Sequence, residues 1–131
     1  RLYPCMSGEE VVAVAANGDV YPCDHLIGID DFLMGNVHDL SFPWDRFYSV
    51  RDRLRKNSVD HRESCRECEL KYLCGGECYA RSLLMRGDIA TSSPDHCILT
   101  KSLAKGIIAE TKEGITDKIK KENLFRFLGK V

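Results

Sequence analysis

Several features that would place a chain in a common class of protein are missing from these 131 residues. No apolar run is long enough to span a bilayer, and no signal-peptide pattern opens the chain. The formal net charge is only −1, so neither nucleic acid nor an anionic membrane is favoured as a partner. The sequence therefore predicts a cytoplasmic protein with a core of one domain's size and no membrane segment.

The charge that is present is unevenly distributed. Residues 1–100 carry 11 Lys and Arg against 16 Asp and Glu, whereas residues 101–131 carry 8 against 4. The basic tail is either a partner surface or, more commonly, a solvated helix face. The first residue is Arg1 rather than Met, which indicates a fragment or domain of a longer chain, although processing would give the same start.

Cysteine, in contrast, is abundant, with seven residues at positions 5, 23, 65, 68, 74, 78 and 97. A disulfide framework would favour a secretion signal and an even count, and the sequence has neither. Four of the seven lie within fourteen residues, from Cys65 to Cys78. Such a cluster in a chain without a secretion signal is more often a metal site than a set of disulfides.

The first half of the chain predicts a hairpin followed by a helix. Two β-rich runs within residues 11–23 flank Asn17-Gly18, the dipeptide that favours a type I′ turn. A short strand is expected within residues 32–37. Ser41 is a plausible N-cap for a helix. The apolar face of that helix, expected in the core, would consist of Trp44, Phe47, Val50 and Leu54.

The second half predicts loops and helices. A polar connection over residues 57–64 leads into the cysteine-rich stretch, and a short helix over residues 79–86 should end at Gly87. Another helix should start at residues 92–95 and be interrupted at Gly114. The last amphipathic segment would carry Ile115, Ile119, Leu124 and Leu128.

These elements predict a small, metal-dominated α+β fold: an N-terminal β-hairpin, cysteine-rich loops around the metal, and flanking and C-terminal helices. The apolar core would be thin around so many loops. Metal ligation would then supply much of the free energy of folding, as it does in other small metallodomains.

The cysteine spacing is Cys5-x12-Gly18-x4-Cys23, then Cys65-x2-Cys68-x5-Cys74-x3-Cys78, then Cys97. Zinc sites and iron–sulfur sites both use Cys-x2-Cys, so the residues alone leave both metals open. A zinc-binding interaction module would need a histidine such as His25 or His96 to complete a second tetrahedral site. Another alternative is a stand-alone, ferredoxin-like electron carrier. The pair Gly75-Gly76 either makes a tight turn or lets the backbone approach an inorganic core.

The whole pattern resembles the SPASM motif of radical-SAM peptide and protein maturases over residues 5–97. Two further segments resemble sequences that recur in this motif: Asn-Gly-Asp-Val-Tyr-Pro-Cys (17–23) and Met-Gly-Asn-Val (34–37). The resemblance implies two 4Fe–4S clusters with interleaved ligands. One cluster would be held by Cys65, Cys68, Cys74 and Cys97, and the other by Cys5, Cys23 and Cys78.

This chain departs from the family in one respect, because some members have an eighth cysteine near the first. One iron of the three-cysteine cluster would therefore lack a protein thiolate. It would be open, or bound by water, a small thiol, the substrate, or a nearby side chain such as Asp24 or His25.

The resemblance also implies a role as the C-terminal auxiliary-cluster domain of a longer enzyme that acts on a peptide or protein. Residues 1–97 would hold both clusters, and residues 98–131 would pack on them or on a missing radical-SAM catalytic domain. The chain has no Cys-x3-Cys-x2-Cys, so S-adenosylmethionine and a third cluster would belong to that parent enzyme, and no catalytic residue is predicted here. Within the family, the sequence from Cys5 to Cys23 looks most like that of the thioether-forming peptide maturases.

Overall fold

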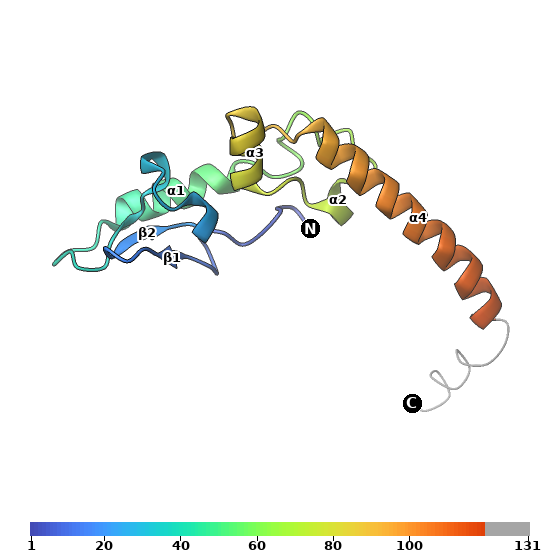
Figure 1. The fold of residues 1–131 in the computed structure, drawn as a ribbon, viewed down its shortest axis with the longest axis horizontal. Coiled ribbons are helices and arrows are strands. Elements are labelled where there is room, and N and C mark those ends of the chain that lie inside the picture. Colours follow the sequence, from blue (N-terminus) through green and yellow to red (C-terminus); the bar gives the residue numbers. More distant parts are fainter. Residues whose placement is uncertain (120–131) are drawn as a thin grey trace, which may run out of the picture. The chain divides into compact units, whose positions relative to one another are not determined.

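The computed structural model describes residues 1–119. Residues 1–94 form one compact unit, and a second unit begins at Asp95. The first unit contains a small sheet, three α-helices and two short 3-10 helices (Figure 1). The small α+β arrangement expected from the sequence is confirmed.

The sheet has three antiparallel strands in the order β1-β2-β3. The strands are β1 (Ala13–Val14), β2 (Asp19–Tyr21) and β3 (Gly35–Asn36). Val20 lies opposite Val14 on one side and Gly35 on the other. Both the hairpin and the additional short strand were predicted correctly.

The hairpin turn differs from the type I′ turn that Asn17-Gly18 favours. A type I′ turn requires a positive φ at both of these residues. Gly18 has a positive φ of 89°, but Asn17 does not, since no non-glycine residue in the described part of the chain has one. The Gly18 N–H donates to the Ala15 carbonyl at 2.9 Å, and the Ala15 N–H donates to the Asp19 carbonyl at 2.8 Å. This is a three-residue loop, in which the Asn17 side chain accepts a bond from the Asp19 N–H at 3.2 Å. In a loop of this type only the last residue, here Gly18, is left-handed.

Helix α1 (Trp44–Arg55) begins directly after Pro43 and has no side-chain cap, so the prediction of Ser41 as N-cap is wrong. Val50 and Leu54 are buried as expected. Trp44, in contrast, is 56% exposed and does not belong to the core. Its ring instead contacts Phe42, Phe47 and Tyr48. Phe47 is partly buried and packs against the core, as expected. A start at Pro43 is favourable because proline has no N–H to satisfy.

Two short 3-10 helices follow the hairpin, Asp24–Leu26 and Asp30–Phe32, and neither was predicted from the residue pattern. Each ends on a fully buried apolar side chain, Leu26 or Phe32. The predicted polar connection over residues 57–64 is also partly wrong, because Val59 and Arg62 in it are buried. A four-residue helix, α2 (Lys71–Cys74), was not predicted either.

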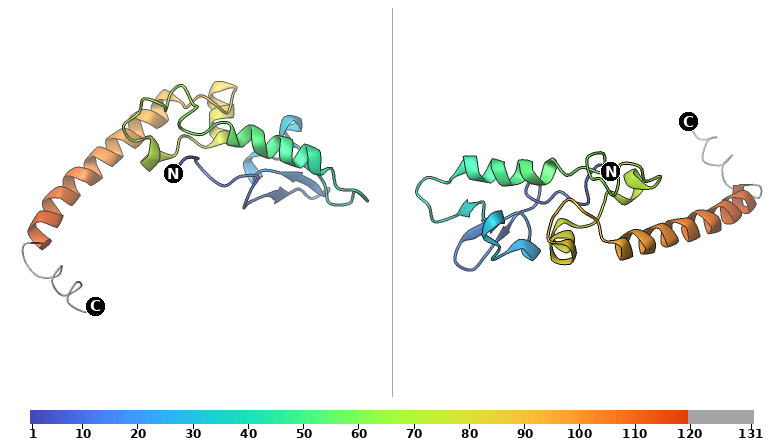
Figure 2. Two further views of the ribbon diagram at one scale, coloured as in Figure 1. Left: turned by 180° about the vertical axis from the view of Figure 1, so that it is seen from behind. Right: turned by 90° about the horizontal axis from the view of Figure 1, so that it is seen from above.

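Helix α3 (Tyr79–Arg86) matches its prediction, including a left-handed Gly87 (φ 77°) at its end. Tyr79 is buried, and its hydroxyl donates to the Leu54 carbonyl of α1 at 3.0 Å. The core therefore lies where the sheet, α1 and α3 meet (Figures 1 and 2). Its buried members are Val20, Tyr21, Leu26, Phe32, Met34, Val50, Leu54, Tyr79 and Ile89.

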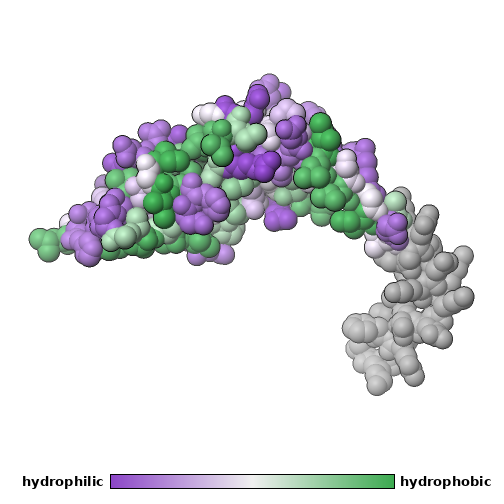
Figure 3. Space-filling model, viewed as in Figure 1, coloured by the Kyte–Doolittle hydropathy of each residue, from purple (hydrophilic) through white to green (hydrophobic). Residues whose placement is uncertain are grey.

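Apolar side chains also remain on the surface of the first unit. Val11, Val12 and Val14 are exposed on and beside the edge strand β1, where Figure 3 shows green at the lower side of this unit. The apolar exposure is therefore confined to the edge of the sheet, because Val20 and Tyr21, which point to opposite faces of the central strand β2, are both buried.

Helix α4 runs from Pro94 to Ile119 without a break, so the predicted interruption at Gly114 is wrong. One glycine inside a helix costs only about 1 kcal/mol, which a long helix tolerates. Its apolar residues Leu99, Leu103 and Ile107 are exposed. The predicted apolar positions Leu124 and Leu128 lie outside the described residues. No helix within residues 1–119 combines the length and the apolar character needed to cross a membrane.

Candidate metal centre

Cys23 stands at the junction between the hairpin and the first 3-10 helix, of which it is the N-cap residue. Burial raises the pKa of its thiol, and a charge on nearby Cys78 raises it further. Hydrogen bonds from Ser7 and from the backbone N–H groups of His25 and Leu26 partly offset this rise in pKa. Hydrogen bonds to a ligand sulfur favour its thiolate form and are one of the features that tune iron–sulfur clusters.

Cys78 comes from the cysteine-rich segment but lies close enough to Cys23 for their charges to interact. It is the N-cap residue of α3 and is exposed. A charge on Cys5 likewise acts on the pKa of Tyr79, the residue that follows Cys78. Burial raises the pKa of Tyr79 to about 12, the positive charge of Arg62 opposes the rise, and Cys5 adds to it. Cys78 is thus near Cys23 although the two are distant in sequence, and Cys5 is near Tyr79, the residue that follows Cys78.

The remaining cysteines of the first unit follow one another on successive turns. The Cys68 N–H donates to the Cys65 carbonyl at 2.8 Å, and the Cys74 N–H donates to the Leu70 carbonyl at 2.9 Å. The Cys65 thiol is buried, with its sulfur 3.6 Å from the Ser92 hydroxyl oxygen. Polar hydrogens around this sulfur would stabilise a thiolate ligand.

The helix that ends at Cys74 is tied to the preceding loop through Asp60. Lys71 Nζ lies 2.8 Å from an Asp60 carboxylate oxygen, and the Tyr72 hydroxyl donates to the same oxygen at 2.9 Å. Both interactions hold the pKa of Asp60 below its ordinary value, and the hydrogen bond to Lys71 contributes most. The turn that presents Cys74 is therefore fixed from outside as well as by its own backbone.

Gly75 and Gly76 are both left-handed, with φ of 77° and 87°. A Cβ at Gly75 would lie 2.7 Å from the Tyr3 carbonyl oxygen, and one at Gly76 would lie 2.7 Å from Arg62 Nη1. No side chain fits at either position. The N-terminal residues, which lead to Cys5, therefore run directly against the loop between Cys74 and Cys78.

A buried charged network behind this loop was not foreseen from the sequence. Arg62 donates Nη1 to the Glu77 carbonyl at 2.8 Å and Nη2 to the Ile89 carbonyl. The Glu77 carboxylate is fully buried and accepts bonds from Arg81 Nε at 2.8 Å and from the Ser93 hydroxyl at 2.9 Å. Its position between two predicted ligands was the one available signal that Glu77 has a role. No comparable signal marks Arg62.

The donor set of the chain is rich in thiols. All seven cysteines carry thiols. Cys97 lies in the first turns of α4, in the second unit. Within residues 1–119, no three His, Cys, Asp or Glu side chains converge on a point that a single metal ion would occupy. The thiol donors and their backbone N–H partners fit an iron–sulfur cluster.

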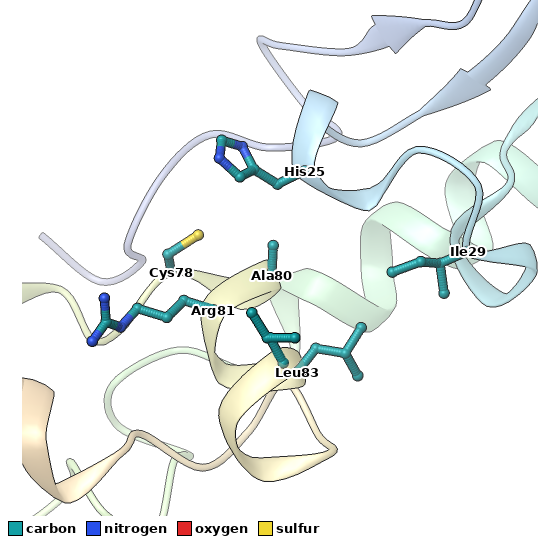
Figure 4. Close-up of a pocket in the computed structure, with 7 residues that line it drawn as sticks. His25, Ile29, Cys78, Ala80, Arg81 and Leu83 are labelled. Carbon is teal, nitrogen blue, oxygen red and sulfur yellow. The ribbon is translucent and has the colours of Figure 1, made fainter.

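A pocket of about 720 Å³ opens beside Cys78. Figure 4 shows the Cys78 thiol directed toward the side of the pocket where the His25 imidazole lies. The other lining residues are Ile29, Ala80, Arg81, Leu83 and Leu84. The predicted three-cysteine cluster would therefore border an open, largely apolar space.

The fold and these thiols define a small cysteine-rich metalloprotein, and comparison with known families makes the class more specific. Residues 5–69 match the family model of the SPASM iron–sulfur cluster-binding domain. The matched segment contains Cys5, Cys23, Cys65 and Cys68 and ends before Cys74. The match supports a SPASM domain in this part of the chain, and a SPASM domain binds iron–sulfur clusters.

The chain is also similar to a protein of Archaeoglobus fulgidus described as uncharacterized. The two are 37% identical over 103 residues, which cover 79% of this chain and 24% of the relative. The chain thus spans about a quarter of the length of this relative.

Proposed function

We propose that this chain is the auxiliary-cluster domain of a longer radical-SAM enzyme that modifies a peptide or protein. The observation that carries the proposal is the proximity of Cys78 to Cys23, across the cysteine-rich segment and the hairpin, within a chain that matches the SPASM domain. In two-cluster ferredoxins, one cysteine of a run likewise ligates the other cluster. The similarity to a protein about three times as long also supports a role as one part of a larger enzyme.

In this proposal, Cys65, Cys68, Cys74 and Cys97 hold one 4Fe–4S cluster, and Cys5, Cys23 and Cys78 hold the other. When bound, the clusters supply one-electron transfer. The residues of the chain set the environment for that chemistry: the N–H groups of His25 and Leu26 stabilise a thiolate at Cys23, and Ser92 does so at Cys65. S-adenosylmethionine and a third cluster belong to the rest of the enzyme, which acts in the cytoplasm.

More specifically, we propose that the longer enzyme is a thioether-forming peptide maturase. The sequence between Cys5 and Cys23 supports this proposal. The pocket beside Cys78 supports a second contribution of the domain, namely positioning of the substrate. Its lining is mostly apolar, with one cation at Arg81, as suits an apolar segment of a peptide.

The test uses the full-length protein purified without oxygen. With S-adenosylmethionine and dithionite alone, a radical-SAM enzyme forms 5′-deoxyadenosine, and we expect Cys23→Ala to retain this activity because the cleaving site lies outside the chain. A colourless, zinc-containing protein would contradict the proposal and favour the zinc module. Clusters without any S-adenosylmethionine cleavage would favour the stand-alone electron carrier.

A further inference from the structure

We propose that His25 is the fourth protein ligand of the hairpin-side cluster and binds its remaining iron through Nε2. This inference rests on the proposed function, because it requires that Cys5, Cys23 and Cys78 hold a cluster. Three cysteines leave one iron of a 4Fe–4S cluster without a protein thiolate. A donor from the same region of the first unit would complete the set.

His25 is placed where such a donor is needed. It lies two residues after Cys23 and lines the same pocket as Cys78 (Figure 4). Of the seven residues that line this pocket, only Cys78 and His25 carry a lone pair that iron can accept. Four others are apolar, and Arg81 is a permanent cation.

Asp24 gives this imidazole the proton arrangement of a metal ligand. Its Oδ1 lies 2.9 Å from His25 Nδ1. An ionised carboxylate only accepts, so in the neutral imidazole Nδ1 carries the proton and Nε2 keeps its lone pair. Carboxylate–histidine pairs of this kind orient many metal-bound histidines.

Two oxygen donors also lie near Cys23. The Ser7 hydroxyl is 2.9 Å from the Pro22 carbonyl oxygen, and Asp24 Oδ1 is 2.9 Å from His25 Nδ1, but neither residue lines the pocket beside Cys78. The His25 side chain is 74% exposed, so a cluster can reach Nε2 without displacing packed atoms. A neutral imidazole in place of a thiolate makes the cluster less negative, which raises its reduction potential.

The test is pulsed EPR on the reduced, cluster-loaded full-length protein, with and without ¹⁵N-labelled histidine. We expect a strongly coupled nitrogen that changes with the label and is lost in His25→Ala. The matched control is His38→Ala, because His38 packs beside Gly18 rather than in the pocket, and it should keep the coupling. Asp24→Asn should retain the cluster but alter the nitrogen coupling.

His25→Cys covers the case in which His25→Ala loses the cluster altogether. It should restore the cluster with no coupled nitrogen and with a more negative reduction potential. A hairpin-side cluster with no histidine nitrogen, or with a coupling that survives in His25→Ala, would overturn the inference while leaving the proposed function intact. If Cys23→Ala removes no cluster signal, the proposed function itself fails, and the ligand fails with it.

Discussion

The guanidinium of Arg62, only 1% exposed, donates Nη1 to the backbone carbonyl of Glu77 at 2.8 Å. Glu77 lies between Cys74 and Cys78, so this bond fixes the backbone that separates two predicted ligands. A second bond, from Nη2 to the Ile89 carbonyl, ties the same guanidinium to the segment before α4. One buried cation therefore organises the loop that carries Cys74 and Cys78.

Arg62→Ala should lower the free energy of unfolding by about 3 kcal/mol or more, because it removes two charge-assisted hydrogen bonds and leaves buried carbonyls unsatisfied. The measurement is the anaerobic melting temperature, together with the iron content. Arg66→Ala is the matched control, since Arg66 is exposed nearby, and it should change neither quantity. Equal behaviour of the two variants would show that the buried network does not hold the loop.

Gly76→Ala should destabilise the protein more than Gly28→Ala does. Both glycines are left-handed, with φ of 87° and 81°, so both substitutions incur a backbone cost of about 1–2 kcal/mol. Only at Gly76 does the new Cβ also meet Arg62 Nη1, at 2.7 Å, whereas nothing lies within 4 Å at Gly28. Thermal unfolding of both variants measures the difference, and indistinguishable melting temperatures would mean that the loop relaxes away from Arg62.

Features that obey local rules were predictable from the sequence, whereas features that depend on tertiary contacts were not. The hairpin and the end of α3 at Gly87 follow from residue preferences, and both were predicted. The proximity of Cys78 to Cys23 was reached only through a resemblance to a family. Arg62 and Glu77 were missed because charged residues in an aperiodic segment predict exposure. Only the folded loops show that both are enclosed and paired.

The errors have a similar cause. Asn17-Gly18 favours a type I′ turn, but the Asn17 side chain bonds the Asp19 N–H and stabilises a different loop. A glycine within a helical pattern often marks an interruption of the helix, yet α4 continues through Gly114. A glycine inside a helix costs only about 1 kcal/mol relative to alanine, so a single glycine need not end a long helix.

Tyr79→Phe should change how stability depends on alkaline pH. The pKa of Tyr79 is raised to about 12, so its neutral form is favoured in the folded protein. Its contribution is present below the ordinary tyrosine pKa of about 10 and is lost between about pH 10 and 12. The variant should be less stable by about 1 kcal/mol at pH 8, where it lacks the bond to the Leu54 carbonyl.

This deficit of the Tyr79→Phe variant should shrink as the pH rises past about 10, because only the wild type then loses stability. Urea unfolding at a series of pH values measures it. A deficit that stays constant across this range would mean that the Tyr79 hydroxyl ionises as freely in the folded chain as in the unfolded one.

Removal of the clusters should unfold the first unit. Its sheet is small, its strands contain two or three residues, and the loops that present the cysteines contain little apolar core. Cluster assembly and folding should therefore be one process. Circular dichroism before and after anaerobic chelation checks this, and an unchanged spectrum and melting curve in the metal-free protein would contradict it.

Cysteines distant in sequence are, in this proposal, divided between two clusters, with Cys23 in one set and Cys97 in the other. Mössbauer spectroscopy, with iron and sulfide analysis, would test this division on the anaerobic full-length protein and its Cys23→Ala and Cys97→Ala variants. We predict that Cys23→Ala damages the hairpin-side cluster and largely spares the four-cysteine cluster, and that Cys97→Ala does the reverse. Loss of the same cluster in both variants would show that the ligands are not divided in this way.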